Sequence, residues 1–535
     1  MRLRRVFLSL LGLLVSASLT VGETKPFDYI VVGAGAAGSV LAARLTENPQ
    51  VNVLVLEAGG RDDDERIYQP AAFRQLIKSP LDWDYTTEKE PYLGDRLVSW
   101  PRGKVWGGSG SITAMVYVRG HPRDFDAWEE LGNEGWGFED VLPYFKKAEN
   151  QERGPSKYHG VGGPQNVADP RWVPPISRAF VEAALEAGLS RNEDFNGEKQ
   201  EGAGLYQLNQ KNGERHSAAA AYLRPALRRE NLTVESHALA TQILFDDHRA
   251  VGVAYLQEGQ SREARAKREV ILSAGTIGSP QLLMLSGIGP AEHLTTLDIA
   301  VIRDLPGVGM NLRDHPRVAL TYESKQALAF DEESAVREYY LERRGPLSGN
   351  GVGAGAFVKV PEDKTSPNIQ IFLTANPRQN TFSLNAALMQ PQSQGRIRLQ
   401  SKDPEDYPLI NANYLAERQD LEGLVAGLAV ARRIAEARAL GEYRGKEVGP
   451  GPEMSEGEEL HRYIRENLMT FFHAVGTCKM GSDPLAVVDD QLRVHGVEGL
   501  RVIDASIMPT LISGATHAAT VMIAEKGADL VKTEW

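Results

Sequence analysis

One segment near the start of the chain constrains its fold more than any other. Residues 27–60 read FDYIVVGAGAAGSVLAARLTENPQVNVLVLEAGG. Residues 29–32 are apolar, rich in β-branched side chains and end abruptly at a glycine, which is typical of a buried strand. Residues 36–45 have a helical pattern, and residues 51–56 form a second apolar run. The segment therefore predicts a β-α-β unit, the building block of a parallel sheet.

The turn between the first strand and the helix carries the glycine motif GAGAAG. Such a turn lets the backbone approach a pyrophosphate, which then sits at the N-terminus of the helix. Glu57 ends the next strand, where its carboxylate can accept from ribose hydroxyls and repel a 2′-phosphate. The pattern predicts an ADP-containing cofactor, FAD or NAD rather than NADP, and the alternative is a glycine turn without a ligand. Besides Glu57, the residues predicted to bind it here are Gly33, Gly35, Ala36, Ala37 and Gly38.

Length and composition set broader limits. The 535 residues exceed one small core, so two connected domains are expected. A net charge of −12 argues against nucleic acid, which requires clustered basic surface. The single cysteine, Cys478, excludes an intrachain disulfide and a cysteine-based zinc site, and no metal site is predicted.

The N-terminus reads MRLRRVFLSLLGLLVSAS, a basic start followed by a short apolar stretch and small residues. This pattern predicts a signal peptide over residues 1–22 and export to the periplasm or beyond. The RRVFLS segment also resembles the twin-arginine signal, with an ordinary secretory signal as the alternative. No later segment reaches the roughly 18 apolar residues of a membrane span, so no transmembrane segment is predicted.

Further along, apolar and polar residues alternate in patterns that indicate both helices and strands. Residues 175–189 and 420–440 have helical periodicity. Residues 231–273 predict a β-meander with NLTVES, ATQILF, AVGVAYL and EVILSAG as its strands. Within residues 315–460, segments such as NIQIFLTA and GRIRLQS suit an antiparallel sheet.

Two longer motifs, GKVWGGSGSITAMVYVRG (103–120) and GTIGSPQLLMLSGIG (275–289), resemble the two signatures of the glucose–methanol–choline (GMC) oxidoreductases, which are FAD enzymes. DWDYTTEKEP, GVGMNLRDHP, HAVGTCKMG and LRVIDASIMP also resemble that family, in its usual order. The resemblance covers essentially the whole chain after the signal. Its HAVGTCKMG segment favours the branch of choline-dehydrogenase-like and alcohol dehydrogenases.

The resemblance implies an α/β fold: a Rossmann-like FAD-binding domain with an interleaved α+β substrate domain built on an antiparallel sheet. The FAD-binding domain would be assembled from residues 23–160, 216–314 and 461–535. Residues 161–215 would connect to the substrate domain, and residues 315–460 would form the main part of that domain.

The resemblance also implies how FAD is held. Gly107 and Gly108 would let the backbone lie flat against the flavin ring, where a Cβ would collide. Ile112 stands where covalently flavinylated members often have histidine, so we predict non-covalent FAD. Thr113 stands where the first signature has Asn or His, and Asp504 with the backbone of Ala505 would close over the diphosphate and flavin. The cofactor residues implied in this way are Gly107, Gly108, Ser109, Thr113, Val116, Asp504 and Ala505.

Two histidines are candidates for catalysis. In the family, the histidine of a segment like FFHAVGT is the base, which implies His473, and a neutral imidazole can take a proton near neutral pH. Its partner is usually His or Asn. An ungapped alignment of the last helix places Ala515 at the partner position and His517 two residues later. His517 would therefore replace the partner, contact the flavin or its ribityl chain, or be structural.

The resulting prediction is oxidation of a primary alcohol to an aldehyde, with electrons passed to a quinone-like acceptor or to O₂. Choline is not favoured, because no aromatic cage with a carboxylate can be identified. One alternative is a GMC-fold lyase or photodecarboxylase without net alcohol oxidation. Another is a flavin-binding protein without catalysis.

Overall fold

The computed structural model describes residues 26–534, so the predicted signal over residues 1–22 lies outside the described residues. The first of two large sheets has β1 (Phe27–Val32) at its centre, paired in parallel with β2 (Val53–Leu56) and with β13 (Gln260–Leu272). β10 (Leu232–Glu235) extends it beyond β2, and β24 (Leu500–Val502) pairs with β13, both in parallel. The predicted β-α-β unit is therefore present.

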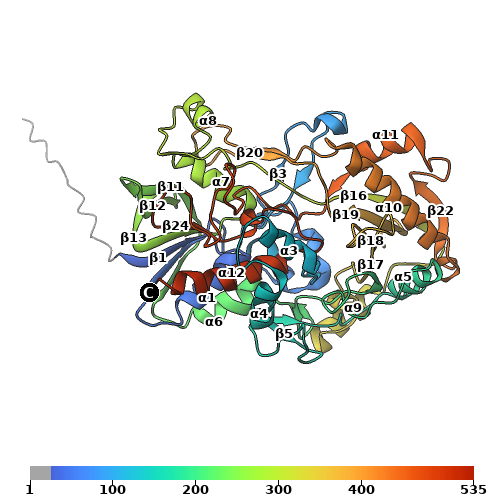
Figure 1. Cartoon of the computed structure of the whole chain (residues 1–535). Helices are drawn as coiled ribbons and strands as arrows, with labels where there is room; N and C mark the ends of the chain where they lie inside the picture. The colour runs from blue at the N-terminus through green and yellow to red at the C-terminus, as the bar shows by residue number, and fades with distance from the viewer. Residues whose placement is uncertain (1–25, 535) are drawn as a thin grey trace, which may run out of the picture.

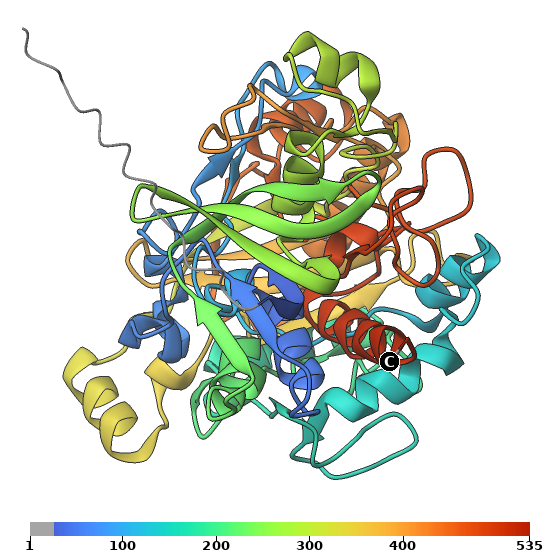
Figure 2. The same cartoon turned by 90° about the vertical axis from the view of Figure 1, so that its left-hand side faces the viewer.

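Helices from both ends of the chain pack beside this sheet. α1 (Ala36–Leu45) begins as the sequence predicts, and α12 (Thr516–Lys532) lies alongside it in both views (Figures 1 and 2). α4 (Phe138–Ala148) packs on α12. The N-terminal turn of α1 and that of α12 thereby belong to the same region of the molecule.

The predicted β-meander is only partly correct. β11 (Ala238–Asp246) and β12 (Arg249–Gln257) pair antiparallel with each other. β12 also pairs antiparallel with residues 260–265, the first half of β13. The first predicted strand, NLTVES, does not join this meander: it forms β10, whose Leu232 lies opposite Val53 of β2 in a parallel ladder. Composition predicts a strand but not its neighbour, and this pairing joins residues far apart in the sequence.

The second sheet is antiparallel throughout, in the order β22-β16-β19-β18-β17-β7, with β23 paired to β16. Its strands are β7 (Gly202–Leu205), β16 (Pro316–Ser324), β17 (Ala354–Val358), β18 (Ile369–Asn376), β19 (Thr381–Leu388), β22 (Arg444–Gly449) and β23 (Met469–Thr470). NIQIFLTA forms β18 as expected. GRIRLQS contributes β20 (Arg396–Arg398), which pairs with β21 (Leu409–Asn411) in a separate two-stranded sheet.

Two helices cover one face of the second sheet, α10 (Arg418–Glu436) and α5 (Pro175–Glu186). At Gly427 of α10 a Cβ would lie 3.0 Å from that of Ala386 and 3.3 Å from Ile369, so helix and sheet are in close contact there. Because side chains alternate along a strand, the residues next to Ile369 point to the opposite face. That opposite face is where the cavity described below is found.

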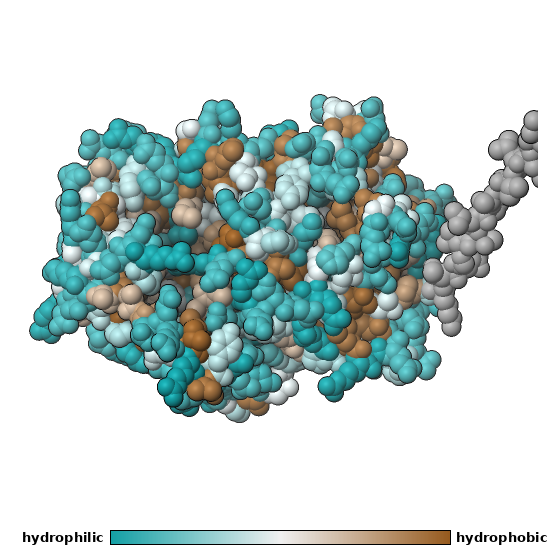
Figure 3. Space-filling model, turned by 180° about the vertical axis from the view of Figure 1, so that it is seen from behind, coloured by the Kyte–Doolittle hydropathy of each residue, from teal (hydrophilic) through white to brown (hydrophobic). Residues whose placement is uncertain are grey.

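The remaining helices are shorter or peripheral. They are α2 (Glu65–Tyr68), α3 (Pro122–Glu130), α6 (Arg224–Ala226), α7 (Gly275–Leu285), α8 (Ala291–Thr296), α9 (Glu332–Glu342) and α11 (Gly457–Asn467). Within residues 26–534, no helix combines the length and the apolar run that crossing a bilayer would require. On the face drawn in Figure 3, hydrophilic residues predominate and hydrophobic ones are scattered among them.

Candidate active site

A cavity of about 1040 Å³ is lined by residues of both large sheets. Its volume is at the upper end of the range for small-molecule sites, which suits a cofactor together with a substrate. Thirteen residues predicted from the sequence line it: Gly33, Gly35, Ala36, Ala37, Glu57, Gly108, Ser109, Thr113, Val116, His473, Asp504, Ala505 and His517. The structure therefore brings together most of the predicted site from segments far apart in the chain.

Two predicted cofactor residues, Gly38 and Gly107, do not line the cavity. A Cβ on Gly38 would lie 1.8 Å from the carbonyl oxygen of Gly33, so this glycine allows close packing of helix on strand. Gly107 has a φ of +84°, and its Cβ would lie 2.3 Å from the hydroxyl oxygen of Ser111. Both positions require glycine because of contacts within the protein, and their role in binding the cofactor stays a prediction.

The nucleotide end of the cavity fits a dinucleotide. Gly35 caps α1 without a side-chain hydrogen bond, and the first turn holds no acidic residue, so its N–H groups are open to a phosphate. Glu57 accepts the amide N–H of Ala34 and of Gly59, both at 2.7 Å, which fixes its carboxylate. Each carboxylate oxygen keeps a lone pair for a ribose hydroxyl. Burial raises the pKa of Glu57.

Asp504 organises a second helix N-terminus at the cavity. It accepts the amide N–H of Gly275 at 2.8 Å, the hydroxyl of Ser279 at 2.6 Å and the amide N–H of Ser506 at 2.8 Å. Burial raises the pKa of Asp504. The carboxylate thus connects α7 with the segment after β24, and both contribute to the cavity wall.

The loop after Gly107 lies directly on the glycine turn. A Cβ on Gly108 would lie 2.8 Å from Cα of Gly35, so the two backbones are in contact. The hydroxyl of Thr113 accepts the amide N–H of Met115 at 3.3 Å. Ile112 also lines the cavity, and its aliphatic side chain has no nucleophile that could bind a flavin covalently. The side chain at this position is therefore consistent with the prediction that FAD is bound non-covalently.

At the other end of the cavity, His473 is paired with a histidine that the sequence did not single out. Nδ1 of His473 lies 2.9 Å from Nδ1 of His315, and Nε2 of His315 lies 3.2 Å from the carbonyl oxygen of Met389. The rings are perpendicular, with centroids 5.1 Å apart. His315 belongs to the segment GVGMNLRDHP, so the signal was in the sequence.

This contact determines the tautomer of His473. A carbonyl can only accept, so Nε2 of His315 carries the proton. Burial lowers the pKa of His315 to about 3, so the ring is neutral at pH 7 and its Nδ1 carries a lone pair instead of a proton. Nδ1 of His473 must therefore be the donor in the contact between the rings. Nε2 of His473 is consequently unprotonated and able to accept a proton.

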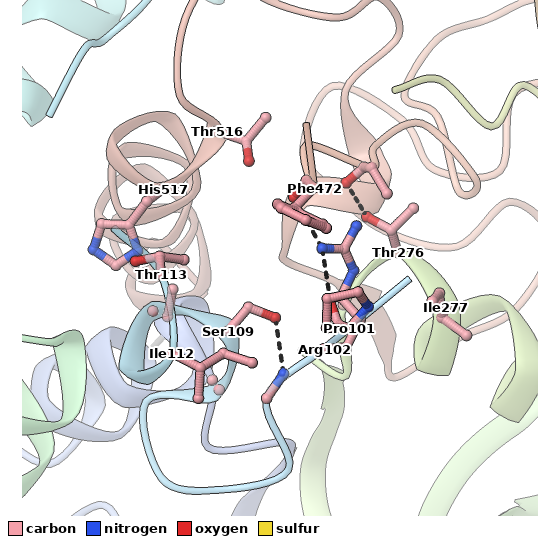
Figure 4. A pocket seen from close by; sticks show the side chains of 18 of the residues that line it. Pro101, Arg102, Ser109, Ile112, Thr113, Thr276, Ile277, Phe472, Thr516 and His517 are labelled. Carbon is pink, nitrogen blue, oxygen red and sulfur yellow. Dashed lines mark hydrogen bonds between the residues drawn. The ribbon is translucent and has the colours of Figure 1, made fainter. Parts of the chain in front are cut away.

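The backbone around His473 is held by Asp314. Its carboxylate accepts the amide N–H of His473 at 2.7 Å and the hydroxyl of Thr470 at 2.6 Å, together with the hydroxyl of Tyr414. Phe472 has a φ of +66°, an uncommon value for a residue with a side chain. Arg102 donates to its carbonyl oxygen at 2.9 Å (Figure 4). These contacts fix an otherwise unfavourable turn.

The same surroundings keep His473 uncharged. Its pKa is held well below the ordinary histidine value, first by burial and then by the nearby His315 and Arg102. At neutral pH the ring is therefore the free base.

His517 lies in the first turn of α12 and lines the same cavity as His473. A Cβ on Gly110 would lie 3.0 Å from its ring, and Figure 4 shows it beside Thr113, on the side opposite Phe472. Its Nε2 is buried without a hydrogen-bond partner, and burial followed by the charge of Arg215 lowers its pKa to about 4. Among the described residues, no hydrogen bond or ring contact joins it to His473, whose imidazole partner is His315.

A dinucleotide cradle at one end and a neutral imidazole at the other define a dinucleotide-dependent oxidoreductase. Comparison with family models specifies which one. The GMC oxidoreductase models match residues 27–317 and 391–524, and the chain belongs to that family, whose members bind FAD.

Similar proteins span nearly the full chain. An alcohol dehydrogenase [acceptor] of Pseudomonas putida is 42% identical over 94% of this chain and 95% of its own. The mitochondrial choline dehydrogenase of Homo sapiens is 42% identical over 98% and 92%. Pyridoxine 4-oxidase from Mesorbium loti has a TM-score of 0.88 and 33% identity over 95% of this chain and 99% of its own.

Proposed function

We propose that the protein oxidises a primary alcohol to an aldehyde with bound FAD as the oxidant and His473 as the base. The observation that carries this is the lone pair on Nε2 of His473, held neutral in a cavity that also contains the dinucleotide cradle. Nε2 takes the hydroxyl proton as the C–H bond breaks, and the carbon–oxygen bond becomes a carbonyl. When bound, FAD supplies the two-electron acceptor that receives this hydrogen as hydride.

The residues that would hold FAD are those of the cradle. The N-terminus of α1 would bind the diphosphate, and Glu57 the ribose. Gly108 and Ser109 line the same cavity as this cradle and His473, and the flavin ring would extend along them. The hydride acceptor would in this way be brought to the substrate carbon next to the base.

The acceptor that reoxidises the flavin is a quinone-like compound or O₂. Relatives named as an acceptor-dependent dehydrogenase and as oxygen-dependent choline dehydrogenases represent both possibilities. Mixing the anaerobically reduced enzyme with O₂ or with a soluble quinone, and following flavin absorbance, distinguishes the two. The faster reoxidation identifies the acceptor.

The base is tested by anaerobic bleaching of the flavin with a panel of aliphatic, aromatic and sugar alcohols. We expect His473→Ala to slow bleaching by about 10²- to 10⁴-fold while the flavin stays bound, because only the proton acceptor is lost. Full activity of His473→Ala would refute the assignment. A lyase or a non-catalytic flavoprotein would show no bleaching with any alcohol.

The role of His517 is tested on the same substrate. We propose that it assists catalysis from the cavity wall near the loop 108–113, because it lines the cavity and has an unpaired ring nitrogen. His517→Ala is then expected to slow bleaching, and Ala515→His to restore part of the rate. An unchanged rate in His517→Ala would leave it a structural residue.

We also propose that the protein is exported, on the basis of the N-terminal segment alone. Arg4→Lys combined with Arg5→Lys is expected to retain the protein in the cytoplasm if the twin-arginine route is used. Continued export of this variant would indicate the ordinary secretory route.

A further inference from the structure

The charged residues that line the cavity are separated by sign. The acidic ones, Glu57 and Asp504, lie at the nucleotide end, and both accept hydrogen bonds from the backbone. No other Asp or Glu lines the cavity within residues 26–534. The part that would receive the substrate therefore has no carboxylate of its own.

The basic residues of the lining lie elsewhere. Arg317 is on β16, Arg102 precedes the loop at Gly108, and Arg74 and Lys78 come from the segment after α2. In the part of the chain that the structure describes, none of these four makes a salt bridge. These basic side chains are thus not held in ion pairs with the described carboxylates, although the whole chain has a net charge of −12.

Among the described residues, the hydrogen-bond partners of Arg317 are all neutral groups. It donates to the carbonyl oxygen of Thr470 at 3.2 Å and to the amide oxygen of Asn385 at 2.6 Å, and its other terminal nitrogen lies 3.7 Å from the sulfur of Met469. Asn385 in turn donates to the hydroxyl of Thr374 at 3.0 Å, which orients its oxygen toward the arginine. The guanidinium is positioned, but its charge is not neutralised by any of these contacts.

The charges around Arg317 compensate its burial only in part. Burial, followed by the charge of Arg74, lowers its pKa to about 10, and Asp314 offsets this only in part. Asp314 does not line the cavity, and its oxygens accept from Thr470, Tyr414 and the amide of His473. Leaving a partly buried charge unpaired is costly, so an anion supplied from outside would be bound favourably.

The strand that carries Arg317 is also in direct contact with the segment that carries the base, His473. It lies two residues after His315, the ring partner of His473, and opposite Met469 in the ladder between β16 and β23. The amide of Phe471 donates to the carbonyl oxygen of His315 at 2.9 Å, which connects the two segments again. The diphosphate of FAD would be at the N-terminus of α1, on the other sheet, and so would leave Arg317 free.

We propose that the substrate is an alcohol that carries an anionic oxygen group, a carboxylate or a phosphate, bound by Arg317, with Arg74 and Lys78 as further cations in the lining of the same cavity. This rests on the proposed function, since it adds the substrate class to the same site. A planar guanidinium binds such a group through two parallel hydrogen bonds, whereas a cationic alcohol such as choline would be repelled. The anionic group takes no part in the oxidation and leaves unchanged with the product.

Binding is tested first with holoenzyme and three probes that have no hydroxyl group to oxidise: hexanoate, hexyl phosphate and the neutral hexanamide. The change in flavin absorbance during titration measures the dissociation constant of each probe. At low salt we expect the better anion to bind about 10-fold or more tightly than hexanamide, with the preference weakening as salt is added. Comparison of hexanoate with hexyl phosphate identifies the anionic group. Equal binding of all three probes would overturn the proposal.

The residue assignment uses three variants with equal flavin content. Arg317→Met is expected to abolish the anion preference. Arg317→Lys is expected to keep part of it, because lysine retains the charge but not the two parallel N–H donors of the guanidinium. Arg74→Gln is expected to weaken the preference; it removes a side chain that makes no hydrogen bond with any residue in the described range 26–534. Arg418→Gln is the control, since this arginine is 88% exposed on α10 and pairs with Glu422. An unchanged preference in Arg317→Met and Arg74→Gln would refute the assignment.

Turnover separates this proposal from the proposed function. Anaerobic bleaching by 6-hydroxyhexanoate or 6-hydroxyhexyl phosphate is compared with bleaching by 1,6-hexanediol. Faster bleaching by an anionic alcohol supports both proposals, and equal or faster bleaching by the diol supports alcohol oxidation but refutes the anionic substrate. Tight anion binding without bleaching by any alcohol supports the anion site and refutes the oxidation.

Discussion

The charge of Arg102 acts on His473 without a hydrogen bond between the two side chains. Arg102 is one of the groups that lower the pKa of His473, and its own hydrogen bonds go to backbone carbonyls. Since only neutral His473 can accept a proton, activity is expected to be constant above that pKa and to fall as the pH drops through it. The position of the acid limb in the pH profile therefore reports the pKa of His473 and how strongly nearby charges lower it.

We expect Arg102→Met to move this acid limb to higher pH, because removal of a nearby cation makes the imidazolium easier to form. The measurement is the pH dependence of kcat/KM for wild type and variant with the same alcohol. Arg418→Gln is the matched control, and its profile should coincide with that of the wild type. A shift of the limb to lower pH would contradict the assigned interaction.

His315 is expected to act through the tautomer of His473. His315→Leu removes the acceptor for Nδ1–H of His473, so the proton can occupy Nε2 and block the base. We expect kcat to fall roughly 10²-fold or more, with flavin content unchanged. His315→Gln, whose side-chain oxygen can accept the same proton, should recover part of the rate. Equal kcat in the leucine and glutamine variants would show that His315 only fills space.

The sequence predicted His473 but not His315, for a physical reason. The base is found by a local motif, whereas the role of His315 depends on a contact with a residue 158 positions later. Gly107 illustrates the opposite case. Its motif was recognised, but its glycine is required by the approach of Ser111, which the sequence does not show.

Helix α12 is linked to neighbouring helices through one buried carboxylate, that of Glu525. Glu525 accepts two hydrogen bonds from Arg44 of α1, each at 2.8 Å, and one from the hydroxyl of Tyr222, also at 2.8 Å. Lys147 of α4 lies 3.3 Å away. The side chain of Glu525 is fully buried, so these partners compensate for the loss of water.

We expect Glu525→Gln to lower the free energy of unfolding by about 3 kcal/mol, because Arg44 keeps its charge but loses a buried partner. Urea denaturation followed by circular dichroism measures this. Glu47→Gln is the control: Glu47 also pairs with Arg44, but its side chain is 40% exposed, and about 0.5 kcal/mol or less is expected. Equal losses in the two variants would show that burial does not decide the effect.

Local sequence patterns predicted many of the helices and strands, but they did not predict which strands pair across long separations in the sequence. The β-α-β unit was predictable because strand, glycine turn and helix follow one another in the chain. The parallel pairing of β10 with β2, and the isolation of β20 from the second sheet, depend on which strands become neighbours. An alternating or apolar pattern does not contain that information.

In the molecule as a whole, the cavity lies where the two sheets meet, and a ligand in it contacts both. FAD is therefore expected to stabilise the entire fold. Free FAD at 100 times its dissociation constant should add about 2.7 kcal/mol to the free energy of unfolding of the apoprotein. Thermal unfolding of apoprotein at several FAD concentrations tests this. A melting temperature that does not change with FAD would contradict the cofactor site.

The meeting of α1 with α12 has a consequence for loading of the cofactor. Gly33, Gly35, Ala36 and Ala37 line the same cavity as Ala515, Thr516, His517 and Thr520, so its wall combines two segments that are far apart in the chain. Until α12 has packed on α1, the nucleotide cradle lacks one side. Cofactor capture must then follow the packing of α12, and a truncation that removes this helix would yield a colourless product even though every glycine of the N-terminal motif is intact.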